Sequence, residues 1–392
     1  MDTTPTPRID PDLARYRSHY PIVERTVYMN SNSMGAMPRT ARDALSTYAD
    51  VWEREGVEAW ETWLPLITEV GDMVARLFNG APGCTALNQN VAFFEAAVAS
   101  CLDFSKGRDK VVMEALQFPN IAYVWERFQK YGARLELVPS DDGITVPLDR
   151  MLEAIDERTA IVPISHGVYV SGFLQDVGAI CRRAREVGAL TLVDVYQTLG
   201  VVPIDVEAWG ADMVVGGSHK WLCGGPGTAF LWVRPELHER LEPKTTGWIA
   251  HAEPFAFEPA PIRYATGAFR FMGGTPSIPA YYVAREGYRP ILEIGVERIR
   301  AHNLALCRII IDRALEAGLT VHSPLEDAHR TGFVAVDFPG SREASARLIA
   351  EGYKHDWRPR CGIRLGPHFY NTEEDVVRTM DRIVELAAEL RS

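Results

Sequence analysis

Several polar residues near the middle of the chain have the types and the spacing of a buried site with a reactive amine. Asp194 lies in the apolar run 190–195, and Ser218, His219 and Lys220 follow the apolar run 212–217. The carboxyl ends of neighbouring parallel strands meet at one edge of a sheet, where open α/β folds bind their ligands. An amine that is removed from water there loses its proton readily and becomes a nucleophile toward a carbonyl group. The spacing also fits a structural lysine that reaches solvent from a strand end.

A mainly parallel sheet must position these residues. Short β-branched runs alternate with amphipathic stretches, a pattern that is typical of βαβ units. Helical patterns cover residues 147–156 and 177–187, and a helix that begins near Asn88 would direct its first N–H groups toward a phosphate. A segment rich in Pro, Gly and aromatic residues, 243–279, is predicted to be a long functional loop. The predicted strands cover residues 110–115, 134–139, 159–165, 190–195, 212–217 and 227–233.

The chain is expected to have three parts. Residues 1–44 form an N-terminal segment that packs on the small domain and the active site, residues 45–283 a large cofactor-binding domain, and residues 284–392 a small C-terminal domain. The small domain is predicted to contain one long helix over about 284–317 and a closing helix after Glu373. Between them, strands are predicted near 319–323 and 331–338.

Composition restricts the function classes. The chain has 392 residues, of which 47% are hydrophobic and 24% charged, values that are typical of a globular protein. A formal net charge of -11 disfavours nucleic acid and anionic membranes as partners. The six cysteines are scattered without a CxxC pair, which predicts reduced thiols in the cytoplasm, no zinc site and no disulfide framework.

The pattern D-x-x-Q at Asp194 and Gln197, followed by S-H-K at residues 218–220, resembles the class V branch of fold-type I pyridoxal-phosphate enzymes. This branch holds cysteine desulfurases, kynureninases and isopenicillin-epimerase-like proteins, and the resemblance runs from about Tyr28 to the C-terminus. It implies an α/β fold with a large, mainly parallel seven-stranded-type sheet domain and a smaller α+β C-terminal domain. It also implies pyridoxal 5′-phosphate as cofactor and a homodimer with shared active sites.

The resemblance assigns roles to the residues of the pattern. Lys220 would form a Schiff base with the cofactor and later move the Cα proton of the substrate. Asp194 would pair with the pyridinium nitrogen, and Gln197 would hydrogen-bond the phenolic oxygen. The phosphate would be bound by Ser218, His219, Gln89, Asn90 and Val91.

Other segments resemble those of kynureninases. They imply that Phe118 stacks on the cofactor ring and that Asn32 lies near the substrate carboxylate, which Arg364 would grip bidentately. They also imply that Trp248 and His251 approach the active site, and that Gly274 and Thr275 bind phosphate across a dimer interface. Four residues have either a site role or a structural one, namely His166, Tyr169, Arg358 and Arg360.

The chain also departs from its relatives. Ile121 stands where kynureninases carry an acid, whereas Gln197 and His219 resemble the desulfurase and epimerase side. Cys361 and Cys223 are poorly placed for the mobile thiol that a desulfurase needs. Selectivity is expected from residues 51–66 and 246–268. An aromatic substrate pocket containing Trp60 and Trp63 and an ordinary helix core face are both open interpretations of the first segment.

The predicted reaction is a kynureninase-like or C–S-lyase-like cleavage at the β-carbon side of an amino acid, through a quinonoid intermediate. The alternative is a class V aminotransferase, epimerase or decarboxylation-linked deaminase on the same scaffold. A silent binding homologue is disfavoured because Lys220, Asp194 and Arg364 are all present. A nicotinamide-binding enzyme is disfavoured because no G-x-G-x-x-G follows the first strand.

Overall fold

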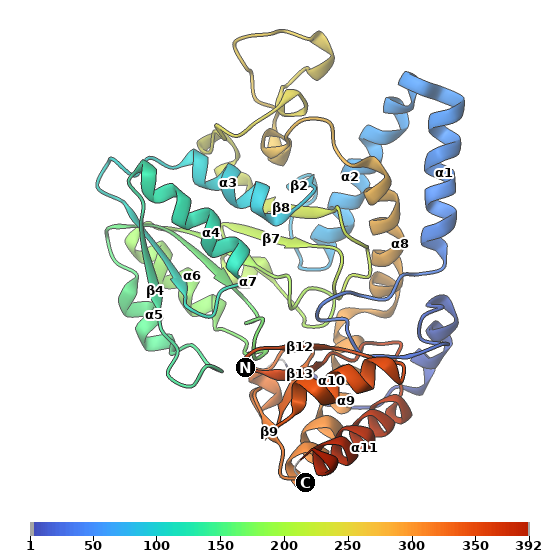
Figure 1. Cartoon of the computed structure of the whole chain (residues 1–392). Coiled ribbons are helices and arrows are strands. Elements are labelled where there is room, and N and C mark those ends of the chain that lie inside the picture. The colour runs from blue at the N-terminus through green and yellow to red at the C-terminus, as the bar shows by residue number, and fades with distance from the viewer. Residues whose placement is uncertain (1–3, 391–392) are drawn as a thin grey trace.

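A seven-stranded sheet forms the centre of the computed structural model, which describes residues 4–390 (Figure 1). The strand order is β2-β8-β7-β6-β5-β3-β4, and β3 to β7 run parallel to one another. β8 is antiparallel to β7 and to β2, a short strand that the sequence pattern did not reveal. The mainly parallel sheet is confirmed. Its strands are β2 (Thr85–Asn88), β3 (Lys110–Glu114), β4 (Arg134–Val138), β5 (Thr159–Ser165), β6 (Leu190–Asp194), β7 (Met213–Gly217) and β8 (Ala229–Val233).

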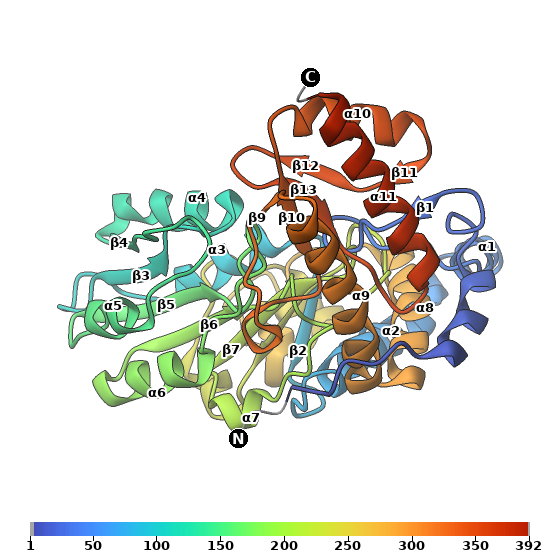
Figure 2. The same ribbon diagram turned by 90° about the horizontal axis from the view of Figure 1, so that it is seen from below.

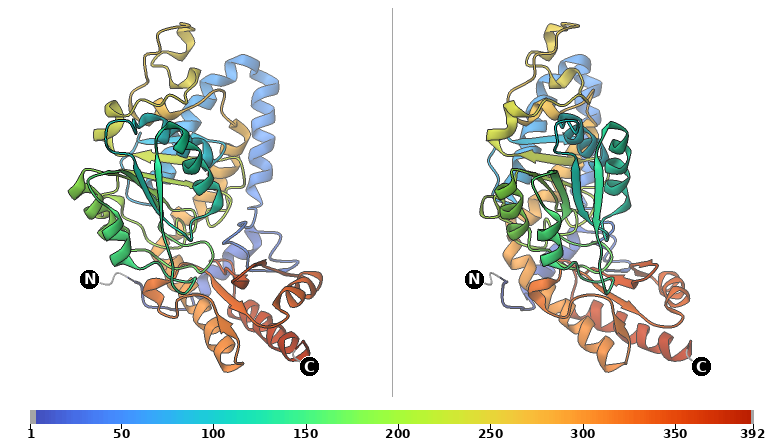
Figure 3. Two further views of the ribbon diagram at one scale, coloured as in Figure 1. Left: turned by 60° about the vertical axis from the view of Figure 1, so that its left-hand side comes forward. Right: turned by 90° about the vertical axis from the view of Figure 1, so that its left-hand side faces the viewer.

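Helices cover both faces of this sheet, with α3 and α4 on one face and α6 on the other (Figure 3). α6 illustrates the local cause: Asp176 caps its N-terminus by accepting a hydrogen bond from Ala179 N at 2.8 Å, and Gly188 ends it at φ 74°. The helices are α1 (Thr40–Glu55), α2 (Trp60–Arg76), α3 (Val91–Cys101), α4 (Pro119–Arg127), α5 (Leu148–Ala154), α6 (Val177–Val187), α7 (Val206–Trp209) and α8 (Ile278–Ile294).

The long helix predicted over 284–317 is wrong, because the structure has two helices there. α8 ends at Ile294 and α9 (Val296–Glu316) begins after Gly295, whose φ of 88° is readily adopted only by glycine. α8 packs against α1 and α2, beside the large sheet (Figure 1). The helix predicted from near Asn88 begins three residues later, because Asn88 ends β2.

The C-terminal part contains a four-stranded antiparallel sheet in the order β12-β13-β10-β9, with a hydrophobic core of its own (Figure 2). The predicted strands correspond to β9 and β10, and the predicted closing helix to α11. The elements are β9 (Thr320–Val321), β10 (Val334–Asp337), α10 (Ser341–Ala350), β11 (Tyr353–Lys354), β12 (Asp356–Arg358), β13 (Gly362–Leu365) and α11 (Glu373–Glu389).

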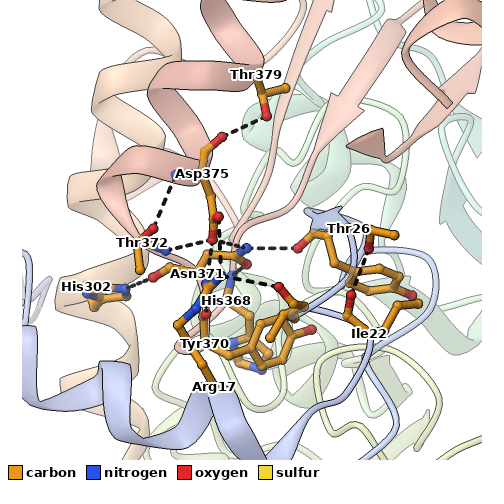
Figure 4. Close-up of polar contacts among 12 residues, drawn as sticks. Arg17, Ile22, Thr26, His302, His368, Tyr370, Asn371, Thr372, Asp375 and Thr379 are labelled. Carbon is orange, nitrogen blue, oxygen red and sulfur yellow. Dashed lines mark hydrogen bonds and ion pairs between the residues drawn. The ribbon is translucent and has the colours of Figure 1, made fainter. Parts of the chain in front are cut away.

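The N-terminal segment 10–39 binds this C-terminal part. β1 (Val27–Tyr28) pairs in parallel with β11, and Asn371 Nδ2 donates to the Tyr28 carbonyl at 2.9 Å (Figure 4). Arg17 Nη1 lies 2.6 Å from Asp375 Oδ2, and the Asp375 carboxylate also accepts the N-cap amide of α11 at Thr372 (Figure 4). These contacts hold the segment beside the start of α11.

The same segment also contacts the turn that carries Lys220. Gly35 N donates to the His219 carbonyl at 2.7 Å, and a Cβ at Gly35 would lie 2.1 Å from the Lys220 carbonyl oxygen. No larger residue fits at Gly35 unless the backbone moves.

The predicted loop 243–279 holds short 3₁₀ turns up to Ile278, where α8 begins, and its middle part projects from the body of the molecule (Figure 1). These turns cover Trp248–Ala250, Pro254–Ala256 and Gly267–Phe271. Between residues 4 and 390, no helix has the length and apolar character needed to cross a membrane.

Candidate active site

A cavity of ≈ 220 Å³ lies at the carboxyl ends of β5, β6 and β7. This is the edge of the sheet where the sequence predicts the site. A larger cleft of ≈ 580 Å³ lies between α5, α6 and the loop 324–329, but neither lysine nor arginine lines it. The smaller cavity is lined by Asn90, Val91, Phe118, Asn120, Ile121, Ser165, Gly167, Tyr169, Asp194, Tyr196, Gln197, His219 and Lys220.

Lys220 reaches into this cavity from the turn after β7. Its Nζ lies 4.6 Å from the centre of the Tyr196 ring and 5.7 Å from that of Phe118. Burial lowers the pKa of the Lys220 amine to about 8, although the nearby Asp194 carboxylate favours the charged form. A substantial fraction of the amine is therefore neutral and nucleophilic in mildly alkaline solution.

Asp194 is the last residue of β6 and is almost fully buried. Burial raises the pKa of its carboxyl to about 6, against the hydrogen bond from Tyr196 N at 2.7 Å and the charge of Lys220. The carboxylate thus lies in a low-dielectric environment, where its attraction for a cation is strong.

The predicted phosphate contacts separate into two groups. Asn90, Val91 and His219 line the cavity, and Asn90 caps α3 through a hydrogen bond from Phe93 N at 3.0 Å. The start of α3 therefore lies at the cavity, and a helix N-terminus stabilises an anion. Ser218 is fully buried and hydrogen-bonded to the Tyr288 hydroxyl, whereas Gln89 is exposed, and neither lines the cavity.

Gln197 links the cavity to the N-terminal segment. Its Nε2 donates to the Asn32 carbonyl at 3.0 Å, and its Oε1 accepts from Trp221 Nε1 at 3.2 Å. The Asn32 amide is fully buried, and within residues 4–390 neither of its polar atoms has a hydrogen-bond partner. An unpaired buried amide is costly unless a ligand completes it.

Arg364 lies on β13 opposite Asp356 on β12. Its Nε donates to Asp356 Oδ1 at 2.8 Å, its Nη2 bonds Asp356 Oδ2, and its Nη1 donates to the Tyr169 carbonyl at 2.5 Å. The Arg364 side chain is only 3% exposed. Arg358, for which a site role was open, is half-exposed, and its Nη2 lies 3.0 Å from Asp356 Oδ2. Arg360 is exposed in the turn between the two strands.

Neither Trp248 and His251, which were predicted to approach the active site, nor Gly274 and Thr275, which were predicted to act across a dimer interface, line this cavity. Trp248 Nε1 donates to Thr275 Oγ1 at 3.3 Å, next to Gly274. The Trp248 ring packs edge-on against Trp60, which itself packs against Trp63 on α2. Trp248 and His251 line a separate hollow of ≈ 370 Å³ in the projecting loop.

The structure also places the residues whose roles the sequence left open. His166 is buried outside the cavity, where its Nδ1 lies 3.0 Å from Thr198 Oγ1, and burial lowers its pKa to about 3. Tyr169 lines the cavity and packs edge-on against Phe118, at a centroid distance of 5.1 Å. Ile121 gives the cavity an apolar wall.

The donor set fits pyridoxal phosphate. Lys220 offers an amine to its aldehyde, Asp194 a buried carboxylate to its ring nitrogen, and the start of α3 N–H groups to its phosphate. Phe118 offers a ring at the cavity wall. Within residues 4–390, no group of His, Cys, Asp or Glu side chains has the arrangement needed to hold a metal ion.

Sequence reasoning missed Tyr196, Ser165 and Gly167 among the residues that line the cavity, and it missed Asp356, the partner of Arg364. Tyr196 lies between Asp194 and Gln197 in the D-x-x-Q motif. An aromatic residue inside that motif could have indicated that Tyr196 lines the cavity. Asp356 pairs with Arg364 only because β12 and β13 form a hairpin in this register.

Comparison with known proteins agrees with this geometry. The sequence pattern of the aminotransferase class-V family matches residues 89–378. The chain belongs to this family. A Bacillus subtilis protein described as the uncharacterized aminotransferase YcbU is 32% identical over 370 residues, which is 94% of this chain and 96% of that protein. The kynureninase of Pseudomonas fluorescens is 29% identical over 90% of this chain and 87% of its own.

Solved structures share the fold. The apo cysteine desulfurase of Thermococcus onnurineus superposes with a TM-score of 0.86 at 22% identity, covering 98% of this chain and 100% of its own. A mutant of C-DES with glycine linked to its pyridoxal-phosphate cofactor gives 0.86 at 20% identity, covering 94% and 99%. The predicted fold class, family and cofactor are confirmed: the protein is a pyridoxal-phosphate-dependent class V enzyme.

Proposed function

We propose that the enzyme cleaves a bond at the β-carbon side of an amino acid. The observation that carries the proposal is the Lys220 amine, whose pKa is about 8, in an aromatic cavity with the buried Asp194. When bound, pyridoxal phosphate withdraws electrons from the Cα atom of the amino acid. Lys220 then takes the Cα proton, because its amine is partly neutral and lies inside the cavity.

Arg364 and Asn32 hold the substrate carboxylate in this proposal. Asp356 binds Nε and Nη2 of the Arg364 guanidinium and the Tyr169 carbonyl binds Nη1, so one hydrogen on each Nη atom is left for a ligand. The unpaired amide of Asn32 adds a donor close to the end of β13, because a Cβ at Gly366 would lie 2.3 Å from Asn32 Oδ1. Two donors of this kind orient a planar carboxylate.

The cysteines argue against a desulfurase mechanism that uses a thiol nucleophile. Cys223 and Cys361 are the two in the segments around Lys220 and Arg364, and both are buried. Burial raises their pKa values to about 12 and about 11, so neither is a reactive thiolate near neutral pH. The likeness to kynureninase over 90% of the chain supports cleavage without a protein thiol.

Transamination is the second candidate, favoured by the 32% identity to YcbU. It uses the same Cα proton transfer by Lys220, but returns the proton elsewhere and leaves the β-carbon bond intact. The residues of the cavity described above serve both reactions.

Product analysis of the holoenzyme separates the two candidates. Purified enzyme is incubated with kynurenine, cysteine S-conjugates and ordinary amino acids, with and without a keto-acid acceptor. The proposal expects anthranilate plus alanine, or a thiol plus pyruvate and ammonia, without any acceptor. A keto acid that is formed only when an acceptor is present would contradict β-cleavage and support transamination.

We also propose a homodimer in which Gly274 and Thr275, next to Trp248, contribute to the partner's phosphate site. Their position away from the cavity of their own chain supports this role. Light scattering on the purified protein should give a mass of two chains, and a monomer that binds the cofactor tightly would contradict the proposal.

The six free cysteines support a reducing compartment, the cytoplasm.

A further inference from the structure

Tyr196 lines the cavity and contacts Asp194, His219 and Gly217. Its N–H donates to Asp194 Oδ1 at 2.7 Å, and its hydroxyl lies 2.8 Å from Nδ1 of His219, the residue before Lys220. A Cβ at Gly217 would lie 2.1 Å from the Tyr196 hydroxyl oxygen, so the absence of a side chain at Gly217 makes room for this contact. The ring and the hydroxyl are therefore both fixed in the cavity.

We propose that Tyr196 is a positioning residue for the cofactor phosphate: its hydroxyl donates to His219 Nδ1 and keeps the imidazole hydrogen on Nε2. This inference rests on the phosphate role of His219. A neutral imidazole carries one N–H, so an Nδ1 that accepts a hydrogen bond leaves Nε2 as the donor. Within residues 4–390, Nε2 has no hydrogen-bond partner from the chain.

The environment keeps both groups neutral, so the Tyr196 hydroxyl is able to donate to His219 Nδ1. Burial raises the pKa of the Tyr196 hydroxyl far above its ordinary value, which keeps the hydroxyl protonated and able to donate. Burial lowers the pKa of His219 to about 4, with a further contribution from the Lys220 charge, so the ring is neutral near pH 7. Nε2–H then acts as an uncharged donor beside the N-terminus of α3, where Asn90 and Val91 line the same cavity.

The test compares two ligands that differ only in the phosphate. Apoenzyme is titrated with pyridoxal phosphate and with pyridoxal, and each affinity is measured from the absorption spectrum. Y196F keeps the ring over Gly217 and removes the hydroxyl. It is expected to weaken pyridoxal phosphate about tenfold while pyridoxal changes by less than about twofold. A partial loss of folded protein would affect both measured affinities equally, so their ratio does not depend on it.

Y281F is the matched control. Tyr281 is fully buried, and its hydroxyl has no partner within residues 4–390, so its loss should leave the ratio of affinities unchanged. H219Q replaces the imidazole by a side-chain amide whose NH₂ group is always a donor. In that background the donor no longer depends on Tyr196, so Y196F should change the affinity for pyridoxal phosphate by less than about twofold.

Three results would overturn the inference. They are an equal effect of Y196F on both ligands, no effect on either, and a full effect of Y196F in the H219Q background. None of these results bears on the products that the enzyme forms. Wild-type enzyme that never joins pyridoxal phosphate to Lys220 would instead overturn the proposed function.

Discussion

Two buried acid–cation pairs lie in or beside the active site, and they are built differently. Lys220 and Asp194 interact across the cavity without a hydrogen bond between their side chains, and burial moves the pKa of each toward neutrality, to about 8 and about 6. Arg364 and Asp356 are joined by two hydrogen bonds. Burial alone would raise the pKa of Asp356, but the bonds and charges of Arg364 and Arg358 lower it below its ordinary value.

The comparison shows how one fold keeps one charge fixed and makes another exchangeable. Hydrogen bonds to the charged form hold Asp356 ionised, so Arg364 remains a permanent cation with a fixed orientation. Without such bonds the cost of burial at Lys220 is only partly compensated by the Asp194 charge, so its proton leaves more easily. The Arg364–Asp356 pair thus suits the proposed carboxylate binding, and the Lys220–Asp194 pair suits the proposed proton transfer.

The largest effect is expected from removing the exchangeable amine. K220A should lower turnover by a factor on the order of 10⁴, because proton transfer by a positioned base contributes up to about that much. Borohydride reduction followed by peptide mass spectrometry should find the cofactor on residue 220 in the wild type only. Retained turnover, or a cofactor attached to Lys110 in the wild type, would contradict the assignment.

The next largest effect is expected at the Arg364–Asp356 pair and is measured as a change in the free energy of unfolding. D356N leaves the Arg364 charge buried and unpaired, and should lower the free energy of unfolding by about 3–5 kcal/mol in urea titrations. The matched control is E351Q, which breaks the two contacts of 2.8 and 2.9 Å between Arg382 and Glu351 at the surface and should cost less than about 1 kcal/mol. Equal costs for both variants would contradict the difference between the pairs.

The D356N difference should also depend on pH. The folded pKa of Asp356 lies below its unfolded value of 3.8, so its stabilising contribution is complete above pH 3.8 and is lost as the pH falls through the folded pKa. Unfolding measured at acidic pH should therefore bring wild type and D356N together. A difference that grows on acidification would contradict this.

A moderate effect is expected from R364K, which keeps the charge and loses the planar fork. KM should rise about 30-fold, equivalent to about 2 kcal/mol, while kcat changes much less, because the carboxylate contact is made before the chemical step. Steady-state kinetics at saturating cofactor measures both constants. A drop in kcat with an unchanged KM would show that Arg364 does not hold the substrate carboxylate.

The smallest effect is a shift in the pH at which the cofactor attaches. The rate should rise with pH through about 8, as Lys220 loses its proton, and level off above it. In D194N the midpoint should move below 8, because the carboxylate that favours the protonated amine is gone. Stopped-flow absorbance records both profiles. An upward shift would mean that Asp194 does not act on Lys220 through its charge.

The sequence was sufficient where local pattern decides the structure. Asp194 and Lys220 follow apolar runs that become β6 and β7, so their meeting at one sheet edge could be predicted without knowing any contact. α6 was predicted at its observed ends from its amphipathic pattern, and in the structure Asp176 and Gly188 supply the cap and the stop at those ends. The role of Arg364 came from resemblance and remains a proposal.

The sequence pattern did not predict the structure where a strand register or a single backbone angle determines it. The Asp356–Arg364 pair depends on a hairpin register that no periodicity specifies. The break at Gly295 interrupts an apolar pattern that continues on both sides, so the sequence read as one helix. Ser218 was expected in the cavity but bonds Tyr288 of α8, a contact between residues 70 positions apart.

The N-terminal segment sets the order in which the site is completed during synthesis. Gly35 lies against the Lys220 turn, and Tyr28 bonds Asn371, 343 residues later. The ribosome therefore makes this part of the site first, but its partners on β13 and at the start of α11 emerge last. Contacts of such sequence separation form late. The complete site is thus a product of the finished chain, and a nascent chain that stops before residue 364 lacks the arginine that we propose for the substrate carboxylate.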